Sequence, residues 1–99
     1  MDIRIMRNNG ESVLTLSGRL DTVTAPQLQE TLIPEFENNG QITLDFAELS
    51  YISSAGLRVL LLAEKTAKSK RVPMRLVGIA PEIMTILEMT GFAEILTIL

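Results

Sequence analysis

Apolar and polar side chains alternate over the first part of the chain. Ile3 and Ile5 alternate with the charged Asp2 and Arg4, and apolar positions resume around Leu14 after an Asn-Asn-Gly triplet at 8–10. A period of two indicates a strand with one buried face, and a triplet of this kind is a hairpin turn signal. The pattern therefore predicts an antiparallel hairpin over residues 2–18.

The rest of the chain switches between helical and strand-like spacing. Leu28, Leu32 and Phe36 recur at helical spacing after Thr24, a residue type that caps helices, while Pro34 predicts a bend or an early end. The predicted elements are a helix over 25–37, a strand over 42–46 that runs into a polar loop, a helix over 54–67, a strand over 74–77, a helix over 81–89 and an apolar final segment over 95–99 that can form a last strand.

This order of elements predicts an α/β fold. Strands separated by helices pair in parallel through right-handed crossovers. The 99 residues are enough for one domain, and 46% of them are hydrophobic and spread along the whole chain. We therefore predict a single small domain over residues 1–99, with a mostly parallel mixed sheet and helices packed mainly on one face.

Composition narrows the classes of partner and chemistry. The net charge is −3 without a long basic run, which argues against direct nucleic-acid binding. The chain has no cysteine and no histidine, so it lacks the commonest metal ligands and the commonest general base. No apolar run is long enough for membrane insertion, and the first residues lack the apolar core of a signal peptide. We expect a cytoplasmic domain without metal or cofactor.

Ser53 and Ser54 stand where the polar loop meets the start of the second predicted helix. The first N–H groups of a helix lack backbone partners and favour negative charge. A serine there can be a helix cap, an anion contact or a phosphorylation target. A hydrolase nucleophile is excluded, because Ile52 replaces the required glycine and the chain has no histidine. No Gly-rich phosphate loop exists either, and we do not expect an enzyme.

Two carboxylates follow predicted strands. Asp21 comes after the hairpin and Asp45 lies at the end of the strand over 42–46. Because functional groups gather beyond the carboxyl ends of parallel strands, both carboxylates could stand near Ser54. Alternatively, Asp21 ends a strand and caps the next turn, and Asp45 binds loop N–H groups.

Four segments in this order resemble the anti-sigma factor antagonists of the STAS domain family. They are Gly18-Arg19-Leu20-Asp21, Ile42-Thr43-Leu44-Asp45, the loop from Tyr51 to Leu57, and Thr90-Gly91-Phe92. Each motif alone is weak, but their order and spacing cover essentially the whole chain. The resemblance implies a STAS-like fold for residues 1–99.

The resemblance also implies a phosphorylation switch. The unmodified antagonist binds an anti-sigma factor that is also a serine/threonine kinase. This binding releases a sigma factor. The kinase then phosphorylates the serine two residues before Gly56, here Ser54, and a phosphatase resets it. Ser53 occupies a position that is often aspartate in the family, and it is the alternative phosphorylation site. By the same resemblance, Asp21 and Gly56 lie near the phosphorylated serine, and Asp45 is expected there from its place at the end of a strand.

The partner-binding surface is expected around the start of the second predicted helix. The contact residues that we predict are Ser53, Ser54, Ala55, Leu57 and Arg58, with Arg58 either at the rim of the contact or simply solvated. On this helix Leu57, Leu60 and Leu61 are expected to face the sheet, while Val59 and Leu62 lie on other sides. An exposed apolar patch beside a modifiable serine suits a switchable docking site.

Two alternatives belong to other classes of function. STAS-like domains also serve as constitutive adaptor subunits of membrane transport systems, and a small-ligand-binding domain is a third class, for which the chain shows no clear cofactor motif. The lysines and the arginine over 65–71 complement the negative end of a helix, which favours a solvated helix end over a binding patch.

Overall fold

A computed structural model describes residues 1–99. In chain order its elements are β1 (Asp2–Asn8), β2 (Glu11–Leu20), α1 (Ala25–Leu32), the 3-10 helix η1 (Ile33–Glu37), β3 (Gln41–Ile52), α2 (Ser54–Lys70), β4 (Met74–Val77), α3 (Pro81–Met89), α4 (Phe92–Ile95) and β5 (Thr97–Ile98).

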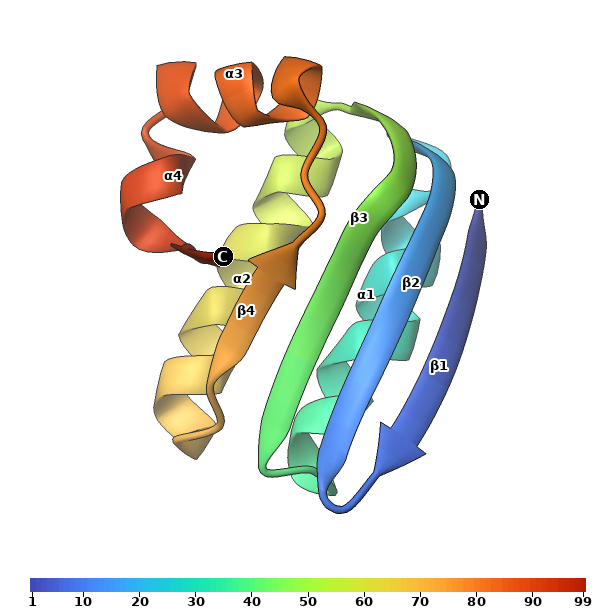
Figure 1. The fold of residues 1–99 in the computed structure, drawn as a ribbon, viewed down its shortest axis with the longest axis vertical. Coiled ribbons are helices and arrows are strands. Elements are labelled where there is room, and N and C mark those ends of the chain that lie inside the picture. The colour runs from blue at the N-terminus through green and yellow to red at the C-terminus, as the bar shows by residue number, and fades with distance from the viewer.

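The five strands form one mixed sheet in the order β1-β2-β3-β4-β5. Only the hairpin of β1 and β2 is antiparallel, and every other neighbouring pair is parallel. Helices α1 and α2 lie side by side behind the sheet, and α3 and α4 lie beyond the β4 side (Figure 1). The predicted α/β class, the mostly parallel sheet and the one-sided helix packing are confirmed.

The core lies between the sheet and helices α1 and α2. It is one cluster of 23 buried residues, drawn from alternate positions of the strands and from one face of each helix. Leu14 and Leu16 of β2 and Leu44 of β3 have no exposed surface, while Val13 and Thr15 on the opposite face are partly exposed. This alternation is the half-buried strand pattern that the sequence predicts. None of the helices combines the length and the apolar character that crossing a bilayer requires.

Strand β3 differs most from the prediction. It continues to Ile52, whereas the sequence predicts a strand that ends at Phe46 and a polar loop beyond it. The pairing of β2 with β3 contains two register shifts, which are β-bulges or similar irregularities. Beyond these shifts the buried residues Leu49 and Ile52 are three positions apart, whereas a regular strand buries every second residue. The sequence of this segment therefore lacks the alternation that identifies a strand. Strand β2 likewise continues past Gly18 to Leu20.

Smaller differences concern the helices. The first predicted α-helix ends at Leu32 and the 3-10 helix η1 follows from Ile33, beside Pro34, so of the predicted bend or early end the early end is observed. Helix α2 extends to Lys70, three residues beyond the prediction, and α4 was not predicted. Val59 was expected to lie away from the core but is only 5% exposed, because α1 packs beside α2 and covers it. Leu62 is 39% exposed, as predicted.

Candidate functional site

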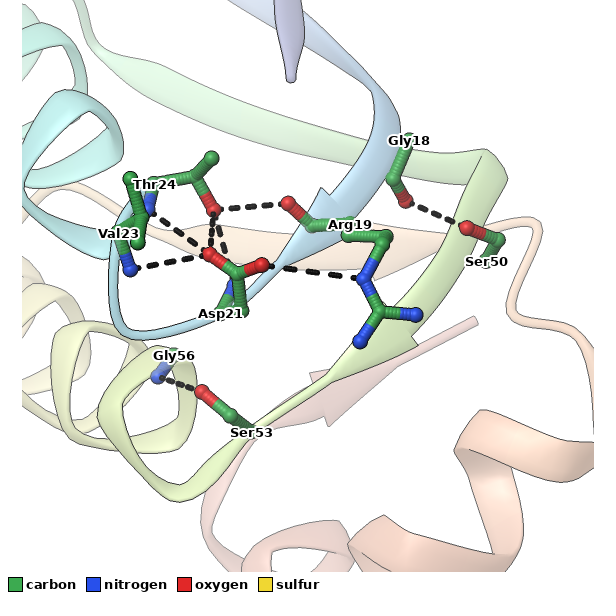
Figure 2. Close-up of polar contacts among 8 residues, drawn as sticks. All are labelled: Gly18, Arg19, Asp21, Val23, Thr24, Ser50, Ser53 and Gly56. Atoms are coloured by element: carbon green, nitrogen blue, oxygen red, sulfur yellow. Dashed lines mark hydrogen bonds and ion pairs between the residues drawn. The ribbon is translucent and has the colours of Figure 1, made fainter.

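Ser53 joins strand β3 to helix α2 and is fixed in place by three hydrogen bonds. Its backbone N–H donates to the Leu20 carbonyl at 2.9 Å, and its carbonyl accepts from the N–H of Leu57 at 3.0 Å. Its hydroxyl accepts from the N–H of Gly56 at 3.4 Å, so Ser53 is the N-cap of α2 (Figure 2). The sequence left open which of the two serines caps the helix, and the structure shows that Ser53 does so.

Ser54 is the first residue of α2 and is exposed to solvent. Its hydroxyl forms none of the side-chain hydrogen bonds of this region, which involve Ser50, Ser53 and the residues of the β2–α1 turn. It therefore stands at the positive end of a 17-residue helix without an internal partner. Of the two serines, Ser54 has the hydroxyl that an external group can reach without breaking the cap.

Gly56 allows the first turn of α2 to approach the ends of β2 and β3. A Cβ atom at this position would lie 2.6 Å from Cγ and 2.9 Å from Cδ2 of Leu20, and 3.1 Å from Cγ1 of Ile52. Carbon atoms in contact are normally about 3.5–4.0 Å apart. The glycine therefore sets the distance between the serine pair and the end of β2.

Asp21 organises the turn between β2 and α1. Its Oδ1 atom accepts hydrogen bonds from the backbone N–H groups of Val23 and Thr24, both at 3.0 Å (Figure 2). In return the Asp21 N–H donates to the Thr24 hydroxyl at 2.9 Å. The bond from the Thr24 N–H is the main cause that lowers the pKa of the Asp21 carboxyl, and Arg19 contributes in the same direction. Asp21 thus has the turn-capping role that the sequence left open.

The same turn lies beside the serine pair. Leu20, whose carbonyl binds the Ser53 N–H, directly precedes Asp21. Thr22 of the turn and Ala55 of α2 line one surface groove. The turn that carries Asp21 therefore lies beside the start of α2, where Ser53 and Ser54 stand (Figure 2).

Asp45 is not part of this group, which corrects the expectation from sequence. It lies within β3, seven residues before the strand ends at Ile52, a distance on the order of 20 Å in extended chain. Its Oδ1 atom accepts a hydrogen bond from the Ala47 N–H at 2.9 Å and lies beside Gly78 in the loop after β4. Asp45 therefore has its alternative predicted role, which is to bind a nearby backbone N–H group. The prediction failed because β3 is longer than its sequence pattern shows.

Arg19 and Tyr51 are site residues that sequence reasoning missed. The Arg19 guanidinium carbon lies 4.0 Å from the centre of the Tyr51 ring, and its Nε atom is 3.8 Å from Oδ2 of Asp21. Arg19 and Tyr51 are partners in the register of β2 with β3, in the segment beyond the bulges. Only the extended pairing of these strands brings them together, so no local sequence signal could have identified the pair.

A groove of about 450 Å³ runs between α1 and α2 next to Ser54. Its lining includes the predicted contact residues Ala55 and Arg58, together with Leu62 and Pro26. Arg58 is exposed and takes part in none of the six ion pairs of the domain. Leu57, also predicted to contact a partner, is only 8% exposed and belongs to the core, because it points from α2 toward the sheet.

Exposed apolar side chains occur on the three elements that adjoin the serine pair, the β2–α1 turn, β3 and α2. Val23 of the β2–α1 turn is 86% exposed, Tyr51 of β3 is 38% exposed, and Leu62 borders the groove. Large apolar side chains at the surface are characteristic of protein contacts when they gather near one another. No group of histidine, cysteine and acidic residues in the domain is arranged to hold a metal ion.

Comparisons with known proteins converge on one family. The family model of the STAS domain matches residues 2–99. BtrV of Bordetella bronchiseptica, a proposed anti-sigma factor antagonist, is 30% identical over 96 residues, covering 96% of this chain and 83% of BtrV. The anti-sigma-B factor antagonist of Bacillus subtilis is 24% identical over 98 residues, covering 99% of this chain and 90% of the relative. The Bacillus cell fate determinant SpoIIAA in its phosphorylated form has the same fold, with a TM-score of 0.77 at 17% identity, over 99% of this chain and 91% of SpoIIAA.

Proposed function

Because the chain belongs to the STAS domain family, we propose that it is an anti-sigma factor antagonist whose binding is switched off by phosphorylation of Ser54. The observation that carries this proposal is the division of roles between the two serines. Ser53 caps α2, while the Ser54 hydroxyl is exposed and unbonded at the same helix end. The names of the relatives support an anti-sigma factor as the partner, and a structural relative is known in a phosphorylated form.

The free domain can accommodate a phosphate on Ser54. A phosphoserine carries about −1.5 to −2 charges at neutral pH, and a helix N-terminus stabilises nearby negative charge by about 0.3–1 kcal/mol. Arg58 lies four residues further along α2, the spacing at which an acidic group and a following cation pair on a helix surface. We therefore expect the phosphorylated domain to keep its fold.

A bound partner changes this balance. Docking over the groove and the exposed Val23, Tyr51 and Leu62 would remove water from the phosphate, and the Asp21 carboxylate of the adjoining β2–α1 turn would add repulsion. Burial of an unpaired charge costs several kcal/mol, whereas about 2.7 kcal/mol is enough to weaken binding a hundredfold. The charge can therefore disrupt the contact without a large conformational change.

The proposed cycle assigns no chemical step to this chain. The anti-sigma factor acts as the serine/threonine kinase and supplies ATP, and a separate phosphatase removes the phosphate. Asp21 would orient the turn next to the acceptor serine. We predict that Asp21→Asn keeps an acceptor oxygen for the turn N–H groups and folds, but accepts phosphate more slowly from the cognate kinase.

Calorimetric titration of Ser54 variants with the cognate kinase tests the switch. Ser54→Ala should bind like the wild type and resist phosphorylation, and Ser54→Asp should fold but bind at least about tenfold more weakly, since 1.4 kcal/mol corresponds to a factor of ten. Ser69→Asp is the matched control, because it adds the same charge to an exposed position at the far end of α2.

Mapping of the phosphate on the wild-type protein completes the test. Phosphate found on Ser53, or binding of Ser54→Asp as tight as that of the wild type, would contradict the assignment. A constitutive transport adaptor, the other class expected for such domains, would be recovered with transporter subunits and would be insensitive to charge at Ser54.

A further inference from the structure

The largest cavity of the domain lies far from Ser54. It has a volume of about 520 Å³, is open to solvent, and is lined by the second half of α2, the start of β4 and the end of β5. Its apolar wall includes Ala67, Val72, Met74 and Leu99. The cavity exists because β5 pairs with β4 only at Arg75 and Leu76, so the preceding part of the β4 edge is uncovered. Glu64, which lines the cavity, is ten residues from Ser54, about 15 Å along the helix axis.

Glu64 brings an unpartnered acceptor to this cavity. Its side chain is only 10% exposed, and its Oε1 atom is the one buried side-chain polar atom of the domain that has no hydrogen-bond partner. Its Oε2 atom lies 4.0 Å from Nζ of Lys68, at the outer limit of an ion pair. Burial raises the pKa of the Glu64 carboxyl. Buried polar groups in native proteins are almost always hydrogen-bonded, so this atom points to a donor supplied from outside the chain.

Cations line the rim of the same cavity. Lys68 has no partner other than the distant Glu64 oxygen, and Arg71 takes part in no ion pair. Arg71 adopts a left-handed conformation at the end of α2, where its backbone N–H binds the carbonyls of Ala67 and Lys68. Arg75 also lines the cavity, but Glu11 and Thr43 already bind it. Lys68 and Arg71 are therefore available to an anionic group.

We propose that this cavity is a binding site for a small amphipathic anion that also carries a hydroxyl group. The apolar body of the ligand would contact Val72, Met74 and Leu99. Its carboxylate or phosphate would pair with Lys68 and Arg71, and its hydroxyl would donate to Oε1 of Glu64. The Lys68 Nζ atom lies only 4.0 Å from Oε2 of Glu64. The hydroxyl and the anionic group of the ligand must therefore be close to each other, as they are in a 3-hydroxy acid. The site is independent of the switch at Ser54.

Three probe molecules of one chain length separate these contributions. The probes are 3-hydroxydecanoate, decanoate and 1-decanol, each titrated below the concentration at which it aggregates and followed by amide chemical shifts. The first should bind, with shifts confined to the cavity residues. Decanoate should bind about tenfold more weakly, because one hydrogen bond is lost, and 1-decanol should show no measurable binding.

Variants of the lining test the individual roles. Glu64→Met should make 3-hydroxydecanoate and decanoate bind equally, and Lys68→Met should weaken both acids about tenfold or more. Lys65→Met is the control, since Lys65 is an exposed cation of the same helix that does not line the cavity. If Glu64→Met does not fold, Lys68→Met and its control decide the matter.

Three results would overturn the proposal. They are no binding of either acid, binding that is unchanged by Lys68→Met, and shifts that map elsewhere on the domain. A stable dimer in light scattering with the cavity at its interface would also overturn it, because a second copy would then be the occupant.

Discussion

The substitution Gly56→Ala tests how closely helix α2 must approach the sheet. The added methyl group would lie 2.6 Å from Cγ and 2.9 Å from Cδ2 of Leu20, well inside contact distance. Leu20 has no exposed surface and Ile52 is only 4% exposed, so neither side chain can turn toward solvent. Relief of the clash therefore requires strained repacking of these side chains or movement of α2 away from β2 and β3, and the movement would also shift Ser53 and Ser54.

The expected loss of stability follows from two opposing effects. Overpacking of a well-packed core costs about 1–3 kcal/mol, and alanine in place of glycine in a helix recovers at most about 1 kcal/mol. We expect Gly56→Ala to lower the free energy of unfolding by about 1–2 kcal/mol. For a domain of this size that corresponds to a decrease in Tm of about 5–15 °C.

Thermal and urea unfolding of a double-mutant cycle provide the measurement. In a Leu20→Ala background, which removes the clashing atoms, Gly56→Ala should be neutral or stabilising. Gly40→Ala is the control, because its new methyl group would meet only the Gly10 carbonyl oxygen at 3.8 Å and should change stability by less than about 0.5 kcal/mol.

A Gly56→Ala variant that melts at or above the wild-type temperature would refute this reasoning. Such a result would mean that Leu20 can repack at no cost. The glycine would then be required for close approach of a partner rather than for packing inside the domain.

Further predictions concern folding and its pH dependence. The domain should unfold cooperatively in circular dichroism with an unchanged Tm in EDTA, because no group of side chains is arranged to hold a metal ion. Glu35→Gln should cost about 1–3 kcal/mol while the exposed Glu37→Gln is nearly neutral, since Glu35 is buried and accepts from Arg7 at 3.0 and 2.7 Å. The Arg7 side chain is the main cause that lowers the pKa of Glu35, so this stabilisation should be complete above the usual value of 4.5 and be lost as pH falls through the lower folded value. Burial raises the pKa of Glu64, so its effect has the opposite sign: Glu64→Gln should stabilise the domain at pH 7 and less so near pH 4, as urea titrations at both pH values would show.

Sequence patterns were sufficient where local rules determine the structure. The alternation of β1 and β2, the end of the α-helix beside Pro34 and the helix that starts at the serine pair follow from periodicity and from the chemistry of caps and prolines. The order of strands and helices determined the mostly parallel sheet, because crossovers between parallel strands have a fixed hand. The motif around Ser54 was visible for the same reason, since all of it lies in one continuous segment.

Tertiary structure decided whatever depends on pairing between distant segments. The pairing of β2 with β3 continues past two register shifts to Ile52, so Asp45 lies far from the end of β3 and Tyr51 lies against Arg19. Packing of α1 beside α2 buried Val59, and the short β5 left Glu64 beside an uncovered sheet edge. The sequence by itself determined most of the elements, though not α4 or the full length of β3, and it identified the serine pair that begins α2. Strand register and helix packing determined which residues lie next to them in space. Register is a property of two paired strands, so the sequence of one strand alone does not specify it.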